Sequence, residues 1–357
     1  MIFLDSARPT GLVIRLLNER FSLRLPIAAL VIFIALLFCT ILLMAISLTL
    51  GSYDISLVQV WNTLLDRSVS DQITIVVWEF RFPRTLVSAL VGAMLALSGA
   101  SLQNVTRNGL ADPSLVGISQ GAGLAVISLV ILWPEYSDQW RSWAAFGGSL
   151  GIAGLIMMLS WSNRNGSSIR FILMGIGVAA FISSITSALM TYGQIEQAMS
   201  ALAWLSGSIN SAGWDEVRML FIWFIALLPL LLGLSRSMAA LQMGEATAIG
   251  LGASTKWLRI ALISVSVGFA AIATAAVGPL GFVGLIAPHA ARRISRSGVG
   301  MHLMISAAIG AFTVTLADLL GRVLFAPVQI PAGLVTAIIG VPIFVFLLSR
   351  SQAKSTI

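Results

Sequence analysis

Two arginines with two residues between them are the first side chains of this sequence whose spacing could recognise another molecule. They belong to Arg81-Phe82-Pro83-Arg84, which directly precedes an apolar run that begins at Thr85. Proline suits the first turn of a helix, so we expect a helix to begin here. Each guanidinium can bind a carboxylate through two parallel hydrogen bonds. The segment is therefore either a surface anchor or a site that recognises acidic groups.

A second pair of ionisable residues, Asp318 and Arg322, interrupts an apolar stretch near the C-terminus. Their spacing of four residues predicts an ion pair along one helix face. Charges in such surroundings are functional candidates, because their burial is costly. A proton relay would require a chain of ionisable groups. Only Asp318 is present in this region and His289 is distant in the sequence, so we do not expect a relay.

A weakly charged segment from Met243 to Gly252 has the pattern of a short helix bounded by glycines. A helix this short is marginal in isolation and needs another surface to cover it. Two interpretations stay open for the segment. It is either a packed loop or a docking element for another protein.

The segment Asn108–Pro113 combines Asn, Gly, Asp and Pro, which favours a turn-rich connector. Ser114, Ser119 and Gln120 then bring polar groups into the next apolar run. Such groups need partners inside the protein, so we expect irregular backbone that is buried or lines a cavity.

Residue counts exclude several chemistries. The single cysteine, Cys39, permits neither an intrachain disulfide nor a metal site with several thiolates. The two lysines, Lys256 and Lys354, follow Thr and Ala, whereas the phosphate-binding loop of ATPases has a glycine directly before its lysine. We therefore expect that this chain is not an enzyme and that it carries no cofactor and no metal. If ATP drives its work, another polypeptide hydrolyses the ATP.

The composition indicates the class of protein. Of 357 residues, 58% are hydrophobic and 10% are charged, and the mean hydropathy is +0.96. A soluble globular protein carries about 25% charged residues. These values exclude a cytosolic enzyme, a secreted domain and a disordered protein, and they predict an integral membrane protein. The net charge of +7 comes from basic residues scattered between apolar runs, which fits membrane topology better than binding to nucleic acid.

The apolar runs predict ten membrane spans, because a spanning helix needs about 20 apolar residues. The run Ile260–Ala291 is too long for one span and breaks at Gly278-Pro279, since proline cannot continue a helix. The nine runs without Asp, Glu, Lys or Arg are Pro26–Leu50, Thr85–Thr106, Pro113–Pro134, Ser142–Asn163, Phe171–Ile195, Met219–Ser235, Ile260–Ala291, Ser297–Ala317 and Val323–Ser349.

The distribution of basic residues predicts the orientation. With ten spans and the N-terminus inside, 15 of the 21 Lys and Arg residues face the cytoplasm, whereas nine spans would divide them 11 to 10. The positive-inside rule therefore favours ten spans with both termini cytoplasmic. The expected organisation is a cytoplasmic segment over 1–25, a transmembrane domain over 26–349 that includes a cytoplasmic segment at about 237–256, and a cytoplasmic tail over 350–357.

Motifs that occur in order along nearly the whole chain resemble one family, the FecCD-type permease subunits of iron-siderophore, haem and vitamin B12 ABC importers. The motifs that carry the resemblance are Arg81-Phe82-Pro83-Arg84, Gly92–Ala100 with Gln103, Arg107–Pro113, Gly117–Ala122, Gly244-Glu245-Ala246 with Leu251-Gly252, Gly281–His289, Ala317-Asp318 with Arg322, and Ile330–Gly333 with Gly340-Val341-Pro342.

This resemblance implies an all-α polytopic membrane protein of about ten transmembrane helices with the type II ABC importer permease fold. It implies import of ferric siderophore across the bacterial inner membrane. The implied partners are a second permease subunit, two ATP-binding subunits and a periplasmic or lipid-anchored substrate-binding protein. The second permease would be a related chain in a heterodimer or another copy in a homodimer. Contact with membrane lipid is expected, and contact with nucleic acid is not.

The resemblance also implies roles for particular residues. Those that would form salt bridges with acidic residues of the binding protein are Arg81, Arg84 and Arg322. Those that would belong to the cytoplasmic helix pair contacting the ATPase are Gly244, Glu245, Ala246, Leu251 and Gly252. Ser167 and Ser168 would form the inner gate, and the span that begins near Phe171 would line the pathway.

Three segments resemble ferric-enterobactin-type permeases in particular, which usually work as heterodimers. These segments are Trp161–Gly166, Ala203–Asn210 and Ala291–Ser295. The chain departs from the family pattern at Gly109, where Pro is usual, at Gln329, where Glu is common, and at Gly300-Met301-His302, which replaces an Asp-His-Arg group. These departures bear on the substrate and on pairing, and leave the family assignment intact.

Two alternatives stay open. The first is import of haem or cobalamin by a member of the same family. The second is an ion-coupled secondary transporter, which would need several intramembrane carboxylates or paired broken helices. Only Asp318 meets that requirement, so we expect the second alternative to fail.

Overall fold

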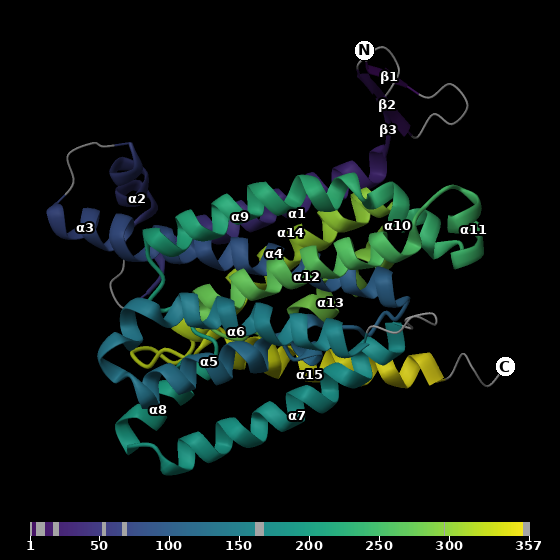
Figure 1. Ribbon diagram of the computed structural model, residues 1–357. Coiled ribbons are helices and arrows are strands. Elements are labelled where there is room, and N and C mark those ends of the chain that lie inside the picture. The colour runs from purple at the N-terminus through teal and green to yellow at the C-terminus, as the bar shows by residue number, and fades with distance from the viewer. Residues whose placement is uncertain are drawn as a thin grey trace.

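A bundle of long helices forms most of the protein, as the computed structural model in Figure 1 shows. The structure describes residues 2–4, 11–16, 21–51, 55–65, 70–160, 168–295 and 297–352. The α-helices are α1 (Ile27–Thr49), α2 (Leu57–Leu64), α3 (Asp71–Ile75), α4 (Phe82–Thr106), α5 (Ile118–Leu132), α6 (Ser137–Ser160), α7 (Ser168–Tyr192), α8 (Ile195–Leu205), α9 (Trp214–Gly233), α10 (Ser235–Gln242), α11 (Glu245–Gly250), α12 (Thr255–Val277), α13 (Val283–Ile294), α14 (Val299–Val323) and α15 (Ala332–Gln352).

The two ends of the bundle carry different short elements. Helices α10 and α11 lie at one end, which we call the α11 end, together with the last turns of α15 (Figure 1). Helices α2, α3 and α8 lie at the opposite end, which we call the α3 end. A π-helical segment, η1 (Val76–Arg81), joins α3 to α4, and two 3₁₀ turns, η2 (Pro113–Val116) and η3 (Pro134–Tyr136), precede α5 and α6.

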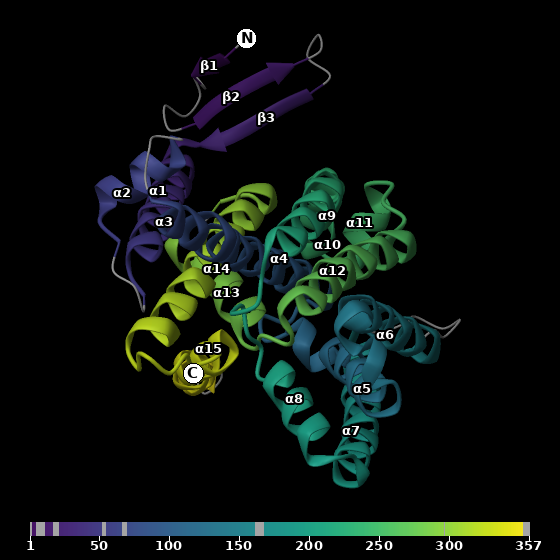
Figure 2. The ribbon, with the colours of Figure 1, turned by 90° about the vertical axis from the view of Figure 1, so that its left-hand side faces the viewer.

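A small antiparallel sheet precedes the first long helix, and the sequence did not predict it. Its strands are β1 (Ile2–Leu4), β2 (Gly11–Leu16) and β3 (Phe21–Pro26), in the order β1-β2-β3. Figure 2 shows the sheet standing apart from the helices. The prediction of an all-α membrane protein is therefore confirmed for the bundle, and the sheet is an addition to it.

Seven helices are long and apolar enough to cross a membrane, within the part of the chain that the structure describes. Two further apolar helices are shorter, over Ile118–Leu132 and Ala332–Phe346. Helix α13, with 12 residues, occupies the second half of the long run that was predicted to break. The break is confirmed, because α12 ends at Val277 and Gly278 adopts a φ of 78°. Each predicted span thus contains a helix, while the number of membrane crossings stays a prediction.

Helix α4 is the central element of the bundle. Figure 2 shows it between α14, α13, α12 and α9. In the 36-residue helical stretch from Asp71 to Thr106, 83% of the most apolar window is buried, against 17% for α1. Small residues explain this difference, because they allow neighbouring helix backbones to approach closely where lipid provides no hydrophobic drive for association.

Glycines mark the points of closest approach. A Cβ atom added at Gly92 would overlap the backbone carbonyl of Gly310 on α14, and one added at Gly99 would overlap the carbonyl of Gly284 on α13. These two glycines therefore act as packing residues between helices. At Gly147, by contrast, a Cβ would meet nothing within 4 Å in the described chain.

The predicted helix start at Arg81–Arg84 is wrong, because the helix begins ten residues earlier. The helical stretch runs from Asp71 through η1 into α4 without interruption. Pro83 has no N–H and would break a regular α-helical ladder at this point. The π turn widens the helix instead: the N–H of Phe82 donates to the carbonyl of Val77, five residues back. Such turns occur often at functional sites.

We predict that Gly99→Ala destabilises the protein, because the added methyl group must push α4 away from α13. Overpacking of this kind costs about 1–3 kcal/mol, and the thermal unfolding midpoint in detergent, read by tryptophan fluorescence, should fall by several degrees. Gly147→Ala is the matched control. It enters open space and favours the helix, so its midpoint should equal or exceed that of the wild type. Equal midpoints for Gly99→Ala and the wild type would contradict the packing argument.

Candidate functional site

A buried ion pair joins α4 to α14 near the α3 end. The Arg84 guanidinium donates from Nε to both carboxylate oxygens of Asp318, at 3.1 and 3.0 Å, and from Nη2 to Oδ1 at 2.8 Å. Its Nη1 donates to Oδ1 of Asn210 at 2.7 Å and to Oε1 of Gln329 at 2.8 Å. The Asn210 and Gln329 amides belong to the loops before α9 and α15. One guanidinium therefore holds four parts of the chain together.

The other two predicted arginines hold the end of α1. Arg81 donates from Nη1 to the carbonyls of Leu48 and Thr49, at 2.7 and 3.0 Å. Arg322 donates from Nη2 to the carbonyl and the hydroxyl of Ser47, both at 2.7 Å. The last carbonyls of a helix have no intrahelical partner, and basic groups satisfy them. Two guanidiniums from distant parts of the sequence thus cap one helix.

All three predicted docking arginines lie below the surface of this chain. Arg81, Arg84 and Arg322 are 5%, 7% and 5% exposed. The sequence predicted that Asp318 would pair with Arg322 along its own helix. Instead, Asp318 bonds to Arg84 across the helix interface, while the hydrogen bonds of Arg322 go to Ser47. When the backbones of two helices are close, a side chain on the neighbouring helix can form a shorter and better aligned hydrogen bond than a residue one turn away on the same helix.

The contacts of α4 with α14 form a ladder with a spacing of one helical turn. Gly92 meets Gly310, Ser88 bonds to the hydroxyl of Thr315 at 3.0 Å, and Arg84 bonds to Asp318. On α4 these residues are four apart and share one face of the helix, and on α14 their partners are five and three apart, so both sets advance by eight residues over about two turns. The pairing partner could not be deduced earlier, because nothing in the sequence states which helices are neighbours.

Sequence reasoning missed Ser47 and Asn210 as parts of this cluster. Asn210 lies in a segment that had been noted only for its resemblance to ferric-enterobactin-type permeases. Gln329 had been noted as a departure from the family pattern, and the structure places this amide directly on Arg84. A neutral amide here leaves Asp318 as the single carboxylate bonded to Arg84 among the described residues.

The predicted coupling segment is a short helix at the α11 end, as expected. Helix α11 covers Glu245–Gly250, and Gly244 and Gly252 on either side have φ values of 125° and 82°, which favour glycine. Glu245 bonds through Oε2 to Arg259 at 2.9 Å and accepts from Thr255 at 3.3 Å. These contacts attach the start of α11 to the first turns of α12.

Large apolar side chains of this segment are uncovered. Leu251 is 67% exposed and Ile249 is 58% exposed, while Ala248 packs inward and is fully buried. Ala246, in the first turn of α11, is also exposed. Together with the exposed side chain of Met243, these residues form an apolar surface at the α11 end. This arrangement favours the docking interpretation over the packed loop.

The second half of the turn-rich connector between α4 and α5, residues 111–113, is buried, as predicted, while Asn108 in its first half is exposed. Asp112 caps η2: its Oδ1 accepts from the backbone N–H of Ser114 at 2.8 Å and from the Ser114 hydroxyl. Burial raises the pKa of the Asp112 carboxyl, and the hydrogen bonds from Ser114 act in the opposite direction. The second half of the connector therefore packs inside the protein.

The predicted gate residues are only partly within the described chain. Ser167 lies outside the described residues, and Ser168 begins α7. Phe171 is buried in a cluster with Leu102 and Ile156, so its own side chain packs inside the bundle. The rest of α7 is exposed along most of its length, since only 11% of its most apolar window is buried. Figure 2 shows α7 at the edge of the bundle.

The bundle and its two specialised ends define a polytopic membrane permease. The sequence model of the FecCD transport family matches residues 39–350, and the chain belongs to this family. It is 36% identical over 332 residues to the Fe(3+)-citrate import system permease protein YfmE of Bacillus subtilis, with 92% of this chain and 97% of that protein covered. It is 35% identical over 327 residues to the Fe(3+) dicitrate transport system permease protein FecD of Escherichia coli, with 91% and 99% covered.

A solved structure has the same fold. It is an inward-facing structure of a transporter that is described as of the metal-chelate ABC type, with a TM-score of 0.79 and 28% sequence identity. The match covers 90% of this chain and 99% of that one. The fold expected from the sequence is therefore confirmed.

We predict that Asp318→Asn strongly destabilises the protein, because it leaves the Arg84 charge buried without a counter-charge. Breaking a buried pair in this way costs about 3–5 kcal/mol. The matched control is Asp215→Asn, which removes a carboxylate from an exposed pair with Arg218 and should change stability by less than about 1 kcal/mol. Thermal unfolding in detergent measures both. The double variant R84Q/D318N should lose less than the sum of the two single losses, and a purely additive result would contradict direct coupling.

Proposed function

We propose that this chain is the permease subunit of an ATP-driven importer that moves ferric siderophore across the bacterial inner membrane. The observation that carries the proposal is the uncovered helix α11 at one end of a membrane bundle, which gives a separate motor protein a place to act. The named relatives support the substrate class, because they are permease proteins of ferric citrate import systems.

The energy source in this proposal is ATP hydrolysis by two separate ATP-binding subunits. Neither lysine of this chain follows a glycine, so the chain lacks the ATPase phosphate loop. An ion-coupled mechanism has less support. Its carrier would be Asp318, whose carboxylate is buried and already hydrogen-bonded to Arg84. In this mechanism, the ATP-binding subunits bind two conformations of the permease with different affinities as ATP is bound and hydrolysed. The switching between these conformations imports the substrate.

A second permease subunit completes the pathway in this proposal, either a related chain or a second copy. Support comes from α7, which is apolar and largely uncovered in the single chain. Leu173, Ile176 and Phe181 are exposed along it. We place the translocation pathway beside α7 and the inner gate at Ser167 and Ser168. Because the side chain of Phe171 is buried, we assign the pathway surface to the exposed residues that follow it.

Docking of a substrate-binding protein at the α3 end is part of the same proposal. A role for Arg81, Arg84 and Arg322 in docking remains a prediction, and their burial adds a condition to it. Each guanidinium is bonded inside the chain, so a carboxylate of the binding protein has to displace an internal acceptor. We therefore expect docking to loosen the end of α1 or the loop that carries Gln329.

The orientation follows from the basic residues. The α11 end carries Arg107, Arg292 and Arg293, and we assign it to the cytoplasm by the positive-inside rule. The start of α1 and the end of α15 lie at this same end (Figure 1), which supports two cytoplasmic termini. We propose a cytoplasmic segment over 1–25, a transmembrane domain over 26–349 and a cytoplasmic tail over 350–357, the boundaries expected from the sequence.

We predict that deletion of this chain abolishes uptake of one class of ferric chelate and spares haem and cobalamin. Cells lacking the chain would be supplied with ⁵⁵Fe bound to citrate, a hydroxamate or a catecholate, and with labelled haem and cobalamin as separate arms. Uptake of one ferric chelate should fall at least ten-fold and should return with the wild-type chain. Loss of haem or cobalamin uptake alone would contradict the substrate class, and uptake that survives ATP depletion would contradict the energy source.

We predict that Leu251→Asp prevents capture of the ATP-binding subunits, because it places a charge on the apolar surface that they would cover. Membrane insertion should be unchanged, while co-purification of the ATP-binding subunits and chelate uptake fall at least ten-fold. Leu57→Asp is the matched control, since Leu57 is similarly exposed but lies on α2 at the opposite end. Normal capture by Leu251→Asp, or equal losses in both variants, would refute the assignment of α11.

A further inference from the structure

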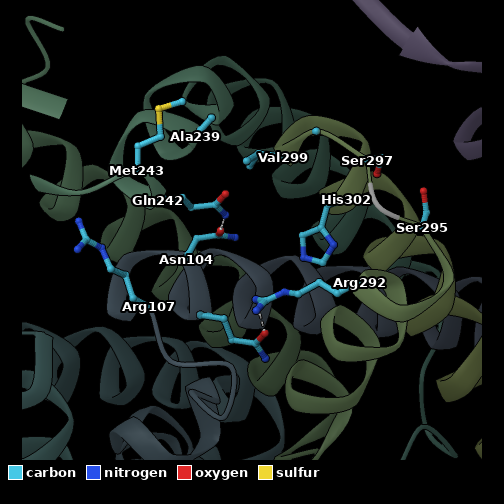
Figure 3. Close-up of a pocket in the computed structure, with 12 residues that line it drawn as sticks. Asn104, Arg107, Ala239, Gln242, Met243, Arg292, Ser295, Ser297, Val299 and His302 are labelled. Carbon is cyan, nitrogen blue, oxygen red and sulfur yellow. Dashed lines mark hydrogen bonds between the residues drawn. The ribbon is translucent and has the colours of Figure 1, made fainter. Parts of the chain in front are cut away.

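A pocket opens at the α11 end that no step of the proposed transport uses. It has a volume of about 700 Å³ and lies between the last turns of α4, helix α10, and the junction of α13 with α14. Figure 3 shows Asn104, Gln242, Arg292 and His302 grouped in the middle of this pocket, with Arg107 at its edge on the far side of Asn104. Those that the argument uses are Asn104, Arg107, Gln242, Arg292, Ser297 and His302.

The pocket is positively charged. Arg107 and Arg292 line it, and none of its described lining residues is acidic. Arg292 donates from Nη2 to Oε1 of Gln103 at 2.8 Å, which fixes one edge of its guanidinium. Arg107 ends α4 in a left-handed conformation, with a φ of 51°, and its side chain is exposed. Two guanidiniums without a carboxylate among the lining residues favour an anionic ligand and repel a cation.

Two polar side chains without hydrogen-bond partners in the described chain line the same pocket as Arg292. His302 is 6% exposed, and neither of its ring nitrogens has a hydrogen-bond partner in the described chain. The Ser297 hydroxyl is also buried without a partner. Both residues lie at the start of α14, where the first backbone N–H groups of the helix are free to bind an anion. Buried polar groups in native proteins are nearly always satisfied, so these point to a missing ligand.

The amide side chains of the pocket already have hydrogen-bond partners. Asn104 accepts a hydrogen bond from Gln242, and Gln103 accepts one from Arg292 (Figure 3). The buried groups without partners among the lining residues are therefore His302 and Ser297, on the side of the pocket that Arg292 lines, while Arg107 lies at the opposite edge. A tetrahedral anion with several acceptor oxygens can meet such a set, because phosphate oxygens pair with arginine forks and with neutral donors.

We propose that this pocket binds a phosphate-bearing anion, which is either the headgroup of an anionic lipid or free phosphate. Basic pockets between transmembrane helices on the cytoplasmic side are known to bind anionic headgroups. The ligand would connect α4 and the start of α14 with α10, whose Gln242 lies just before the coupling segment. An effect of this ligand on coupling rests on the proposed function, whereas the binding itself does not.

The experiment measures binding to the purified full chain and requires no transport. The chain would be delipidated and placed in nanodiscs of phosphatidylcholine with or without phosphatidylglycerol, and retained lipid would be read by native mass spectrometry. A parallel arm would titrate detergent-solubilised chain with ³²P-labelled inorganic phosphate. The variants are R107Q/R292Q, and R107Q alone in case the double variant folds poorly. The matched control is R293Q, which removes the same charge from the next residue of α13, outside the pocket lining.

We expect the wild type and R293Q to bind one phosphate probe with similar affinity and R107Q/R292Q to bind it at least ten-fold more weakly. Selective retention of phosphatidylglycerol would assign the site to lipid, and pocket-dependent binding of inorganic phosphate would assign it to a soluble anion. The proposal is overturned if neither probe binds, or if R293Q weakens binding as much as the pocket variants. A last test labels the thiol of the R107C variant. The proposal is also overturned if the ATP-binding subunits protect this thiol from the labelling reagent and neither phosphate probe does.

Discussion

The close approach of α4 to α14 is the constraint on which the rest of the structure depends. Two glycines, Gly92 and Gly310, let the helix backbones touch. One turn along, this distance brings the hydroxyls of Ser88 and Thr315 within 3.0 Å, and one turn further it brings Arg84 onto Asp318. A larger residue at either glycine would separate the helices and lengthen both polar contacts. Packing and electrostatics are therefore one requirement here, because an ion pair this deeply buried stabilises the protein only when its geometry is good.

The two ends of the bundle differ in how far their polar and apolar groups are covered within the chain. At the α3 end, arginines from two helices bond to the end of α1 and to the loops around it inside a single chain, and Arg322 Nε is the buried atom of these guanidiniums that has no partner among the described residues. At the α11 end, apolar side chains of the coupling segment are uncovered and the donors of His302 and Ser297 are unsatisfied. The first arrangement suits an end that must hold together. The second suits an end that is completed by other molecules.

Much of the fold was predictable from the sequence, because long apolar runs indicate helices that lie in lipid and the basic residues between these runs indicate where the helices end. The break at Gly278-Pro279 and the short helix between Gly244 and Gly252 also followed from local chemistry. The sheet before α1 was not predicted. The sequence did not predict the early start of the α3–α4 helical stretch, because a proline such as Pro83 normally stands in the first turn of a helix. Here the helix continues through Pro83 because the π turn before it accommodates a residue without an N–H.

The candidate site was harder to predict than the fold. The three arginines were recognised by type and position, but their burial depends on which helices are neighbours, and that information is not local. Asn210 and Gln329 illustrate the same limit, since each is far from Arg84 in the sequence and bonds to it through space. The pocket at the α11 end depends on three separate stretches of the sequence. His302 became informative only when both ring nitrogens proved to lack partners.

The uninterrupted helical stretch from Asp71 to Thr106 has a mechanical consequence. Its 36 residues, at 1.5 Å each, make a rod of about 54 Å, while the hydrocarbon layer of a bilayer is about 30 Å thick. Unless it tilts steeply, roughly 20 Å of this rod stands in water or among headgroups. A force applied to its projecting part moves one continuous helix, because no loop within this stretch could act as a hinge. Its far tip carries Asn104, so movement imposed on one side of the membrane is delivered directly to the other.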